Sequence, residues 1–324
     1  MKILLTGGAG YIGSNTSYNL IEKGHDVTII DNLENGNLKL VPRDSYFIES
    51  DISDVEKITQ LLKEKKFDLI MHFAAYTRVA ESVKFPEKYF INNFEKAKIF
   101  FDICINNGLK KIIFSSTGAI YGMSDGKYLK ESKSPDPINP YSSSKLKFEN
   151  YVKELAYEKK INAIILRYFN VCGADVKLRT GLMSNPDNLI KAICEVALRK
   201  KNTLVVNGND YKTKDGTAIR DYIHVTDLAE MHILAAERLY SSIDIGAEIY
   251  NCGYGIGYTI MDIINCVNNL IDKKINYKIG PRRKGDAESS IASSIKFKKQ
   301  FNWEPKYNNL NYIIKTALEW EKKI

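Results

Sequence analysis

The middle of the chain holds side chains that can remove a proton from a hydroxyl group. Tyr141 and Lys145 are four residues apart in a segment with helical spacing, so both project from one face. Tyrosine is a poor base at neutral pH because its ordinary pKa is about 10, but an adjacent ammonium favours the phenolate. Thr117 follows an apolar run and can donate to, or accept from, the reacting oxygen. Chemistry on a hydroxyl is therefore predicted, although a Tyr-x-x-x-Lys pair alone is common on helix surfaces and Thr117 could instead bind local backbone.

A glycine-rich segment near the start of the chain predicts a dinucleotide site. Gly7, Gly10 and Gly13 directly follow the first apolar run and open the first amphipathic one. Gly7 permits a tight turn, Gly10 lets the backbone approach a pyrophosphate, and Gly13 lets the helix pack closely on the strand. The helix N-terminus then faces the phosphates. The nicotinamide cation of such a cofactor would further favour the Tyr141 phenolate.

Acidic residues that end the next strands indicate which dinucleotide binds. Asp31 lies near the offset of about 20 residues at which an acid accepts the adenosine ribose hydroxyls, and its carboxylate repels a 2′-phosphate. Asn32 and Leu33 follow it, with no arginine to receive that phosphate, so NAD is predicted rather than NADP. Asp51, followed by Ile52, could hold the adenine amino group or could instead be a helix cap or turn acid.

Short apolar runs alternate with longer amphipathic ones over the first 170 residues, which is typical of β-α-β units that build a parallel sheet. We expect strands at Lys2–Thr6, Asp26–Asp31, Ser45–Glu49, Leu69–Phe73, Lys111–Ser115 and Ala163–Tyr168, and crossover helices at Ile12–Lys23, Val55–Lys65, Glu87–Asn107 and Tyr141–Lys159. Open α/β sheets bind ligands at the carboxyl ends of their strands, where the glycine loop and Thr117 fall.

After Asn170 the alternation of apolar and amphipathic runs becomes less regular and the expected elements are shorter. Helix-like segments follow at Asp227–Leu239 and Leu310–Lys322. The predicted fold class is α/β. A doubly wound parallel-sheet Rossmann domain that binds NAD is expected over residues 1–170, and a smaller α/β substrate-binding domain over residues 171–324. Segments around 221–240 are expected to pack back on the first domain.

Composition excludes several classes of function. The chain has 324 residues, a net charge of +8, five scattered cysteines and four histidines without metal-ligand spacing, so no metal is predicted. The lysines form short clusters on expected helix faces rather than a basic stripe with interleaved aromatics, so no nucleic-acid partner is predicted. No apolar run is long enough for a membrane span or placed as a signal peptide, so we expect a cytoplasmic protein with no membrane partner.

Longer motifs carry a resemblance to a known family. The stretches GGAGYIGS, HFAA, SSTGAIYG, NPYSSSK and RYFN resemble those of the extended short-chain dehydrogenase/reductase superfamily. Within it, GNDYKTKDGTAIRDYIHVTDLA (Gly208–Ala229) and PRRKGD (Pro281–Asp286) are similar to the UDP-glucose (UDP-galactose) 4-epimerase family. The resemblance implies an isomerase that inverts carbon 4 of a UDP-hexose through a 4-keto intermediate, a UDP-sugar bound between the domains, and a homodimer in which the helices Glu87–Asn107 and Tyr141–Lys159 could supply the interface.

The resemblance and the residues together give the predicted site. The catalytic residues are Thr117, Tyr141 and Lys145. The cofactor-binding residues are Gly7, Gly10, Tyr11, Ile12, Gly13, Asp31, Asn32, Asp51, Ile52, Phe73, Ala74, Ala75, Asn92, Ser115, Tyr141, Lys145 and Tyr168. The substrate-binding residues are Thr117, Tyr141, Asn170, Asn188, Leu189, Asn207, Arg220, Tyr222, Arg283, Asp286 and Ser290. An arginine's planar fork suits diphosphate, and Asp286 can accept from ribose hydroxyls.

Two positions depart from the family pattern. Thr77 stands where some members carry a lysine near the nicotinamide ribose or phosphate, which implies weaker retention of NAD. Ser290 stands where some relatives carry a tyrosine that restricts the sugar pocket, which leaves room for the N-acetyl group of UDP-N-acetylglucosamine or UDP-N-acetylgalactosamine.

Two other functions fit the same motifs. One is a nucleotide-sugar dehydratase or decarboxylase; those relatives place an acid shortly after the Thr117-like residue, whereas Gly118 and Ala119 follow it here. The other is a non-catalytic NAD-binding regulator, which the intact Thr117, Tyr141 and Lys145 disfavour.

Overall fold

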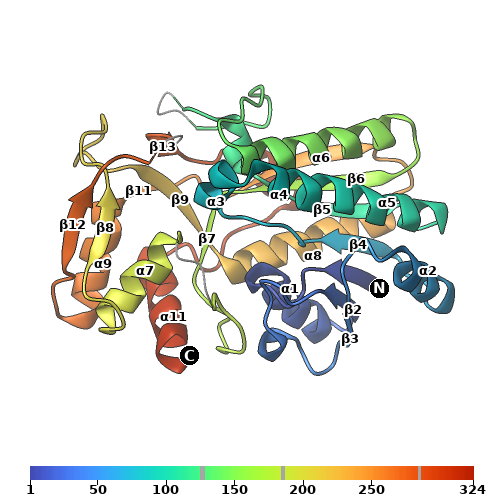
Figure 1. The fold of residues 1–324 in the computed structure, drawn as a ribbon, viewed down its shortest axis with the longest axis horizontal. Coiled ribbons are helices and arrows are strands. Elements are labelled where there is room, and N and C mark those ends of the chain that lie inside the picture. Colours follow the sequence, from blue (N-terminus) through green and yellow to red (C-terminus); the bar gives the residue numbers. More distant parts are fainter. Residues whose placement is uncertain (125–127, 184–186, 284–285) are drawn as a thin grey trace. The chain divides into compact units, whose positions relative to one another are not determined.

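A seven-stranded sheet is the largest layer in the computed structural model, which describes residues 1–124, 128–183, 187–283 and 286–324 (Figure 1). Its strand order is β10-β6-β5-β4-β1-β2-β3. The strands are β1 (Lys2–Thr6), β2 (Asp26–Asp31), β3 (Tyr46–Glu49), β4 (Leu69–His72), β5 (Lys111–Thr117), β6 (Asn162–Tyr168) and β10 (Ala247–Cys252). The pairs β1–β2, β1–β4, β2–β3 and β4–β5 are parallel.

The doubly wound fold expected from the sequence is confirmed, with small shifts at the strand ends. β5 runs two residues further than expected, so Thr117 is the last residue of the strand rather than a residue after it. β10 was not predicted. It lies at the edge of the sheet and only Tyr250, Asn251 and Cys252 of it are buried, so its apolar pattern is weak.

Helices cover both faces of this sheet. They include α1 (Tyr11–Glu22), α2 (Val55–Glu64), α3 (Val79–Lys84), α4 (Pro86–Phe90), α5 (Ala97–Asn106), α6 (Pro140–Tyr157) and α8 (Val225–Ser241). Figure 1 shows α4, α5 and α6 on one face and α1 and α8 on the other. The helix expected over Glu87–Asn107 is instead α4 and α5 joined by a π-helical segment, Ile91–Lys96. Apolar spacing does not reveal the extra residue of a π turn, and such turns are frequent at functional sites.

An aromatic cluster fixes α5 and α6 on the middle of the sheet. Phe148 of α6 lies with its ring centroid 4.9 Å from that of Phe101 on α5 and 4.9 Å from that of Phe114 on β5. All three rings are fully buried. Edge-to-face pairs of this kind contribute about 0.5–1.5 kcal/mol each beyond their buried area, so α6 is held firmly against β5.

The contacts divide the chain into two compact units, each formed by several segments. The first unit comprises Met1–Thr117, Asn139–Arg167 and Ala229–Tyr250, and contains most of the seven-stranded sheet. The second unit comprises Gly118–Ile138, Tyr168–Leu228 and Asn251–Ile324.

The second unit is itself a mixture of strands and helices. Strands β11 (Gly257–Thr259), β9 (Ile219–His224) and β13 (Ser289–Ser290) are neighbours, and β7 (Asn170–Cys172) also pairs with β9, while β8 (Leu204–Asn207) pairs with β12 (Tyr277–Gly280). Its helices include α7 (Leu189–Ala197), α9 (Ile260–Ile271), α10 (Ile295–Phe301) and α11 (Leu310–Lys323). Short 3₁₀ turns lie at Leu38–Leu40 and Gly118–Tyr121. Within the described ranges, we find no helix long and apolar enough to cross a bilayer.

Candidate active site

Helix α6 begins directly before Tyr141, so its first turn sets the position of that side chain. The Asn139 side chain caps the helix by accepting from the Ser142 backbone N–H at 2.9 Å, and Pro140 occupies the first helical position. Lys145 follows one turn later, on the buried side. The Asn-Pro pair and the aromatic cluster around Phe148 together fix where this face of α6 meets β5.

Thr117, Tyr141 and Lys145 meet at the carboxyl end of β5. The Tyr141 hydroxyl is hydrogen-bonded to the Thr117 side chain. Lys145 Nζ donates to the Ser115 carbonyl at 2.7 Å and lies 4.9 Å from the centroid of the Phe114 ring. The structure therefore brings the three predicted catalytic residues, and Ser115, into one cluster within the first unit.

The electrostatic setting of Tyr141 differs from the one expected. Burial raises the pKa of Tyr141, and the hydrogen bond with Thr117 opposes that rise. Burial also lowers the pKa of Lys145 to about 7, so near neutral pH this side chain is only partly charged. In the chain by itself, burial therefore penalises both charged forms, and the expectation that the Lys145 ammonium and a nicotinamide cation favour the phenolate stays a prediction.

A buried ion pair that we did not predict links α6 to the two strands beneath it. Glu149 and Arg167 side chains are 0% and 2% exposed and form an ion pair, with Arg167 Nε donating to the carboxylate at 3.1 Å. Ser116 Oγ donates to the same carboxylate at 2.9 Å. Glu149 thus connects the helix of Tyr141 and Lys145 to β5 and β6. Its position four residues after Lys145, on the same face of α6, is the sequence signal that could have revealed it.

The glycine loop has the shape that a dinucleotide requires. Gly7 has φ +75°, and a Cβ there would lie 2.6 Å from the Ala74 backbone nitrogen. A Cβ at Gly13 would lie 2.3 Å from the Gly7 carbonyl oxygen, so the first turn of α1 must approach this loop closely. Among the described residues, no side chain caps α1 at Gly10. The loop and the uncapped N-terminus of α1 therefore fit a diphosphate.

Asp31 is held so that its carboxylate faces the same loop. It accepts from the backbone N–H groups of Ala9 at 3.0 Å and Leu33 at 2.9 Å. Burial raises its pKa despite these two bonds. Each carboxylate oxygen keeps acceptor capacity for a ribose hydroxyl, so the donor and acceptor set fits NAD.

Asp51 already has protein partners. Its carboxylate accepts from Lys96 Nζ at 2.6 Å, from the backbone and side chain of Ser53 at 2.9 and 2.6 Å, and from Asn32 Nδ2 at 3.4 Å. The cap of α2 is Asp54 instead. Asp51 therefore acts as a turn acid in the structure, and contact with the adenine stays a prediction.

The other predicted cofactor residues lie in the first unit, except Tyr168, which falls in the second. Phe73, Ala74 and Ala75 follow β4, and Phe73 packs its ring 4.8 Å from His232 of α8. Tyr11 and Ile12 open α1, Ile52 is buried after β3, and Asn92 lies in the π segment.

The predicted substrate residues lie in the second unit, apart from Thr117 and Tyr141, and β9 is at their centre. Arg220 and Tyr222 point to one face of β9 because they are two residues apart. Ser290 of β13 pairs with Arg220, and Asn170 of β7 pairs with Tyr222. The structure therefore brings these four positions onto three adjacent strands.

The remaining predicted substrate residues lie at the ends of elements. Arg220 forms an ion pair with Asp286. Asn207 ends β8, and Asn188 caps α7 by accepting from the Lys191 N–H at 3.0 Å, with Leu189 next. Arg283 precedes Lys284 and Gly285 of the predicted PRRKGD motif, and those two residues lie outside the described residues.

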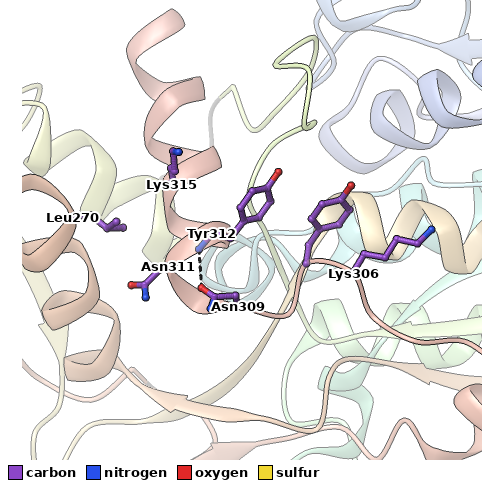
Figure 2. Close-up of a pocket in the computed structure, with 7 residues that line it drawn as sticks. Leu270, Lys306, Asn309, Asn311, Tyr312 and Lys315 are labelled. Atoms are coloured by element: carbon purple, nitrogen blue, oxygen red, sulfur yellow. Dashed lines mark hydrogen bonds between the residues drawn. The ribbon is translucent and has the colours of Figure 1, made fainter.

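A pocket of about 490 Å³ lies elsewhere in the second unit, beside the start of α11 (Figure 2). Its lining, within the described part of the chain, is Leu270, Lys306, Tyr307, Asn309, Asn311, Tyr312 and Lys315. Tyr307 and Tyr312 stack with ring centroids 5.3 Å apart, and Asn309 caps α11 by accepting from the Tyr312 N–H at 3.2 Å. These residues are different from those predicted to bind cofactor or substrate.

Comparison with known proteins identifies the family of the chain. The model of the NAD dependent epimerase/dehydratase family matches residues 3–253. A UDP-glucose 4-epimerase from Lacticaseibacillus casei is 39% identical over 99% of this chain and 97% of its own length.

Two solved structures share the fold over the whole chain. The UDP-glucose 4-epimerase of Stenotrophomonas maltophila, with bound NAD and formylated UDP-arabinopyranose, superposes with a TM-score of 0.95 at 32% identity and covers 100% of this chain and 98% of that one. The UDP-Glc/GlcNAc 4-epimerase of Campylobacter jejuni superposes with a TM-score of 0.86 at 37% identity, covering 100% and 99%. The resemblance inferred from the motifs is confirmed, and the chain belongs to the NAD dependent epimerase/dehydratase family.

Proposed function

We propose that this protein is an NAD-dependent UDP-hexose 4-epimerase that interconverts UDP-glucose and UDP-galactose. The observation that carries the proposal is the hydrogen-bonded Thr117–Tyr141 pair, placed with Lys145 where α6 meets β5 of the sheet that also bears the Gly7–Gly13 loop. Relatives with this architecture over their full length are 4-epimerases. The dehydratase and regulator alternatives are not favoured by these relatives.

The side chains have separate tasks in this reaction. NAD, held by the glycine loop and Asp31, supplies a hydride acceptor and donor at carbon 4 of the sugar. Tyr141 takes the proton of the 4-hydroxyl and later returns it, while Thr117 holds the same oxygen. Lys145, anchored on the Ser115 carbonyl, is only partly protonated near neutral pH and can exchange a proton beside them. The 4-keto sugar turns over within the site, so the configuration inverts without net oxidation.

The two parts of the chain divide the binding work in this proposal. Residues 1–170 bind NAD and residues 171–324 supply most of the contacts to the UDP-sugar, with Arg220, Arg283 and Asp286 at the diphosphate and ribose, while Thr117, Tyr141 and Asn170 of the first segment also contact the sugar nucleotide. A homodimer formed through α5 and α6 is part of the same proposal. A cytoplasmic location is supported by the five cysteines, all free and buried, since reduced thiols are usual in that compartment.

The test is a product analysis without added cofactor. Purified protein is incubated with UDP-glucose, UDP-galactose and their two N-acetyl counterparts, and the bound nucleotide is then released by denaturation and identified. Conversion of UDP-galactose to UDP-glucose, with NAD released, supports the proposal. A strict need for NADPH contradicts it. Loss of water or carbon dioxide would favour the dehydratase or decarboxylase alternative, and unchanged sugar with NAD bound would favour the regulator.

We also propose that the protein accepts N-acetylated UDP-hexoses. Ser290 is half-buried on β13, directly beside Arg220 in the strand register. A serine leaves space that a larger side chain would fill at this position. The relative from Campylobacter jejuni, named as an enzyme of both UDP-Glc and UDP-GlcNAc, supports the wider range.

Ser290→Tyr is expected to lower kcat/KM for UDP-N-acetylglucosamine by about 10-fold or more, since pocket exclusion is worth roughly 1–3 kcal/mol. The value for UDP-glucose should change far less, because its 2-hydroxyl does not need the space. Ser290→Ala is the control and should leave both values near wild type. Wild-type protein that turns over neither N-acetyl sugar would refute the proposal.

A further inference from the structure

The glycine loop lies between two other loops of the first unit. In the sheet order, β1 is flanked by β4 and β2. The loop after β2 folds back onto the glycine loop, where the Asn37 N–H donates to the Ala9 carbonyl at 2.9 Å. The loop after β4 lies against Gly7 at Ala74. A link between the two flanking loops must therefore pass across the carboxyl end of β1.

Such a link is present in the structure. The Tyr76 hydroxyl, from the loop after β4, donates to Glu34 Oε2, from the loop after β2, at 2.5 Å. Lys88 of α4 reinforces the pair, since its Nζ lies 3.8 Å from Glu34 Oε1 and 4.4 Å from the centroid of the Tyr76 ring. The lysine also lies 3.1 Å from Glu81, so one cation partly neutralises two carboxylates.

The backbone of Tyr76 is fixed by Asn93, which also contacts the helix of the catalytic residues. The buried Asn93 side chain accepts from the Tyr76 N–H at 2.8 Å and donates to the Tyr76 carbonyl at 3.0 Å. The same amide donates to Ser144 Oγ of α6 at 3.1 Å. The backbone of Tyr76 is thus tied to the helix that carries Tyr141 and Lys145, and its hydroxyl is directed with little conformational freedom.

We propose that Tyr76 and Glu34 form a bridge over the glycine loop that retains NAD between turnovers. The inference rests on the proposed function, because it takes NAD as the bound group. The bridge joins the loops on both sides of the glycine loop, where the pyrophosphate is expected, so release of the cofactor requires its hydrogen bond to open. It touches no reacting atom and acts by positioning. Retention then does not depend on a lysine at position 77, contrary to the weaker binding expected from Thr77.

If the Tyr76–Glu34 pair only stabilised the fold, its loss would lower the melting temperature and leave the release rate of NAD unchanged. Glu34 is 46% exposed, and exposed ion pairs typically contribute about 0–1 kcal/mol to stability. Loss of the link should therefore leave the melting temperature almost unchanged. The release rate of NAD is the property that distinguishes retention of the cofactor from a surface tie.

The experiment measures loss of bound NAD from the purified holoenzyme diluted into an NAD-degrading glycohydrolase, with residual NAD assayed after denaturation. Tyr76→Phe, which keeps the ring beside Lys88, should release NAD about fivefold faster or more, as expected for a hydrogen bond to a charged group. Glu34→Ala should speed release of NAD to the same extent. Glu34→Gln keeps an acceptor, so its release rate should lie between those of wild type and Glu34→Ala. Tyr157→Phe, at a 90% exposed residue of α6, is the control and should match wild type.

The outcomes separate this bridge from the proposed function. Equal rates of NAD release in wild type, Tyr76→Phe and Glu34→Ala overturn the bridge. If Tyr76→Phe has a lowered melting temperature, the comparison is made with Glu34→Ala alone. Wild-type protein that purifies without NAD, yet epimerises once NAD is added, also overturns it while the function stands. Absence of epimerisation even with NAD contradicts the function itself.

Discussion

Tyr141→Phe is expected to lower kcat for UDP-galactose by about 1,000-fold, within the range of roughly 10²–10⁴ that a positioned acid–base group contributes. The substitution removes only the hydroxyl that is bonded to Thr117. The ring, the first turn of α6 and the Lys145–Ser115 contact remain. We therefore expect normal folding and unchanged NAD content, with the loss confined to the chemical step.

Steady-state kinetics with cofactor quantification checks this result. Tyr157→Phe serves as the matched control, because it makes the same change on the same helix at an exposed position. Thr117→Val should cause a smaller loss than Tyr141→Phe, since Thr117 holds the oxygen but is not the base. A Tyr141→Phe protein that keeps more than a tenth of wild-type kcat would exclude Tyr141 as the proton acceptor.

Glu149→Ala is expected to lower the free energy of unfolding by about 3–5 kcal/mol, the usual cost of breaking a buried ion pair from one side. Arg167, whose side chain is 2% exposed in the wild-type protein, would lose its carboxylate partner, and Ser116 would lose an acceptor. Because the pair connects α6 to β5 and β6, we also expect kcat to fall in the protein that remains folded.

Urea denaturation measures the change in the free energy of unfolding. Glu158→Ala, at the end of α6, is the control. It removes the exposed partner of Lys160 and should lower the free energy of unfolding by less than about 1 kcal/mol. The double variant Glu149→Met, Arg167→Met should recover much of the stability, since apolar replacement of a buried pair is often neutral. If it also recovered full kcat, the pair would have no part in positioning Tyr141. A cost below about 1 kcal/mol for Glu149→Ala would show that the pair is not important for folding.

Local signals made most of the first unit predictable. The strand–glycine–helix order around Gly7 and the acid at Asp31 each combine a local sequence pattern with a backbone requirement, and the structure places them as expected. The carboxyl ends of parallel strands meet at one edge, so the sequence predicts Thr117 there, and the helix of Tyr141, which follows this strand in the chain, is predicted to begin at the same edge.

Features that depend on tertiary context could not be predicted in this way. β10 is a half-exposed edge strand, and the π segment at Ile91–Lys96 has no signature in apolar spacing. The Glu149–Arg167 pair joins a helix residue to a strand residue 18 positions later in the chain, a contact that forms only when α6 packs on β6. The pKa of Tyr141 was expected to fall, but burial, which the sequence does not quantify, raises it.

The central claim is that hydride leaves carbon 4 and returns to the same carbon inside one closed site. It is tested most directly with UDP-galactose deuterated at carbon 4, incubated with the purified protein in ordinary water without added cofactor. The account predicts UDP-glucose that keeps the deuterium at carbon 4, formed at a rate unaffected by added NAD. Loss of deuterium to solvent, or no product until NADPH is supplied, would contradict it.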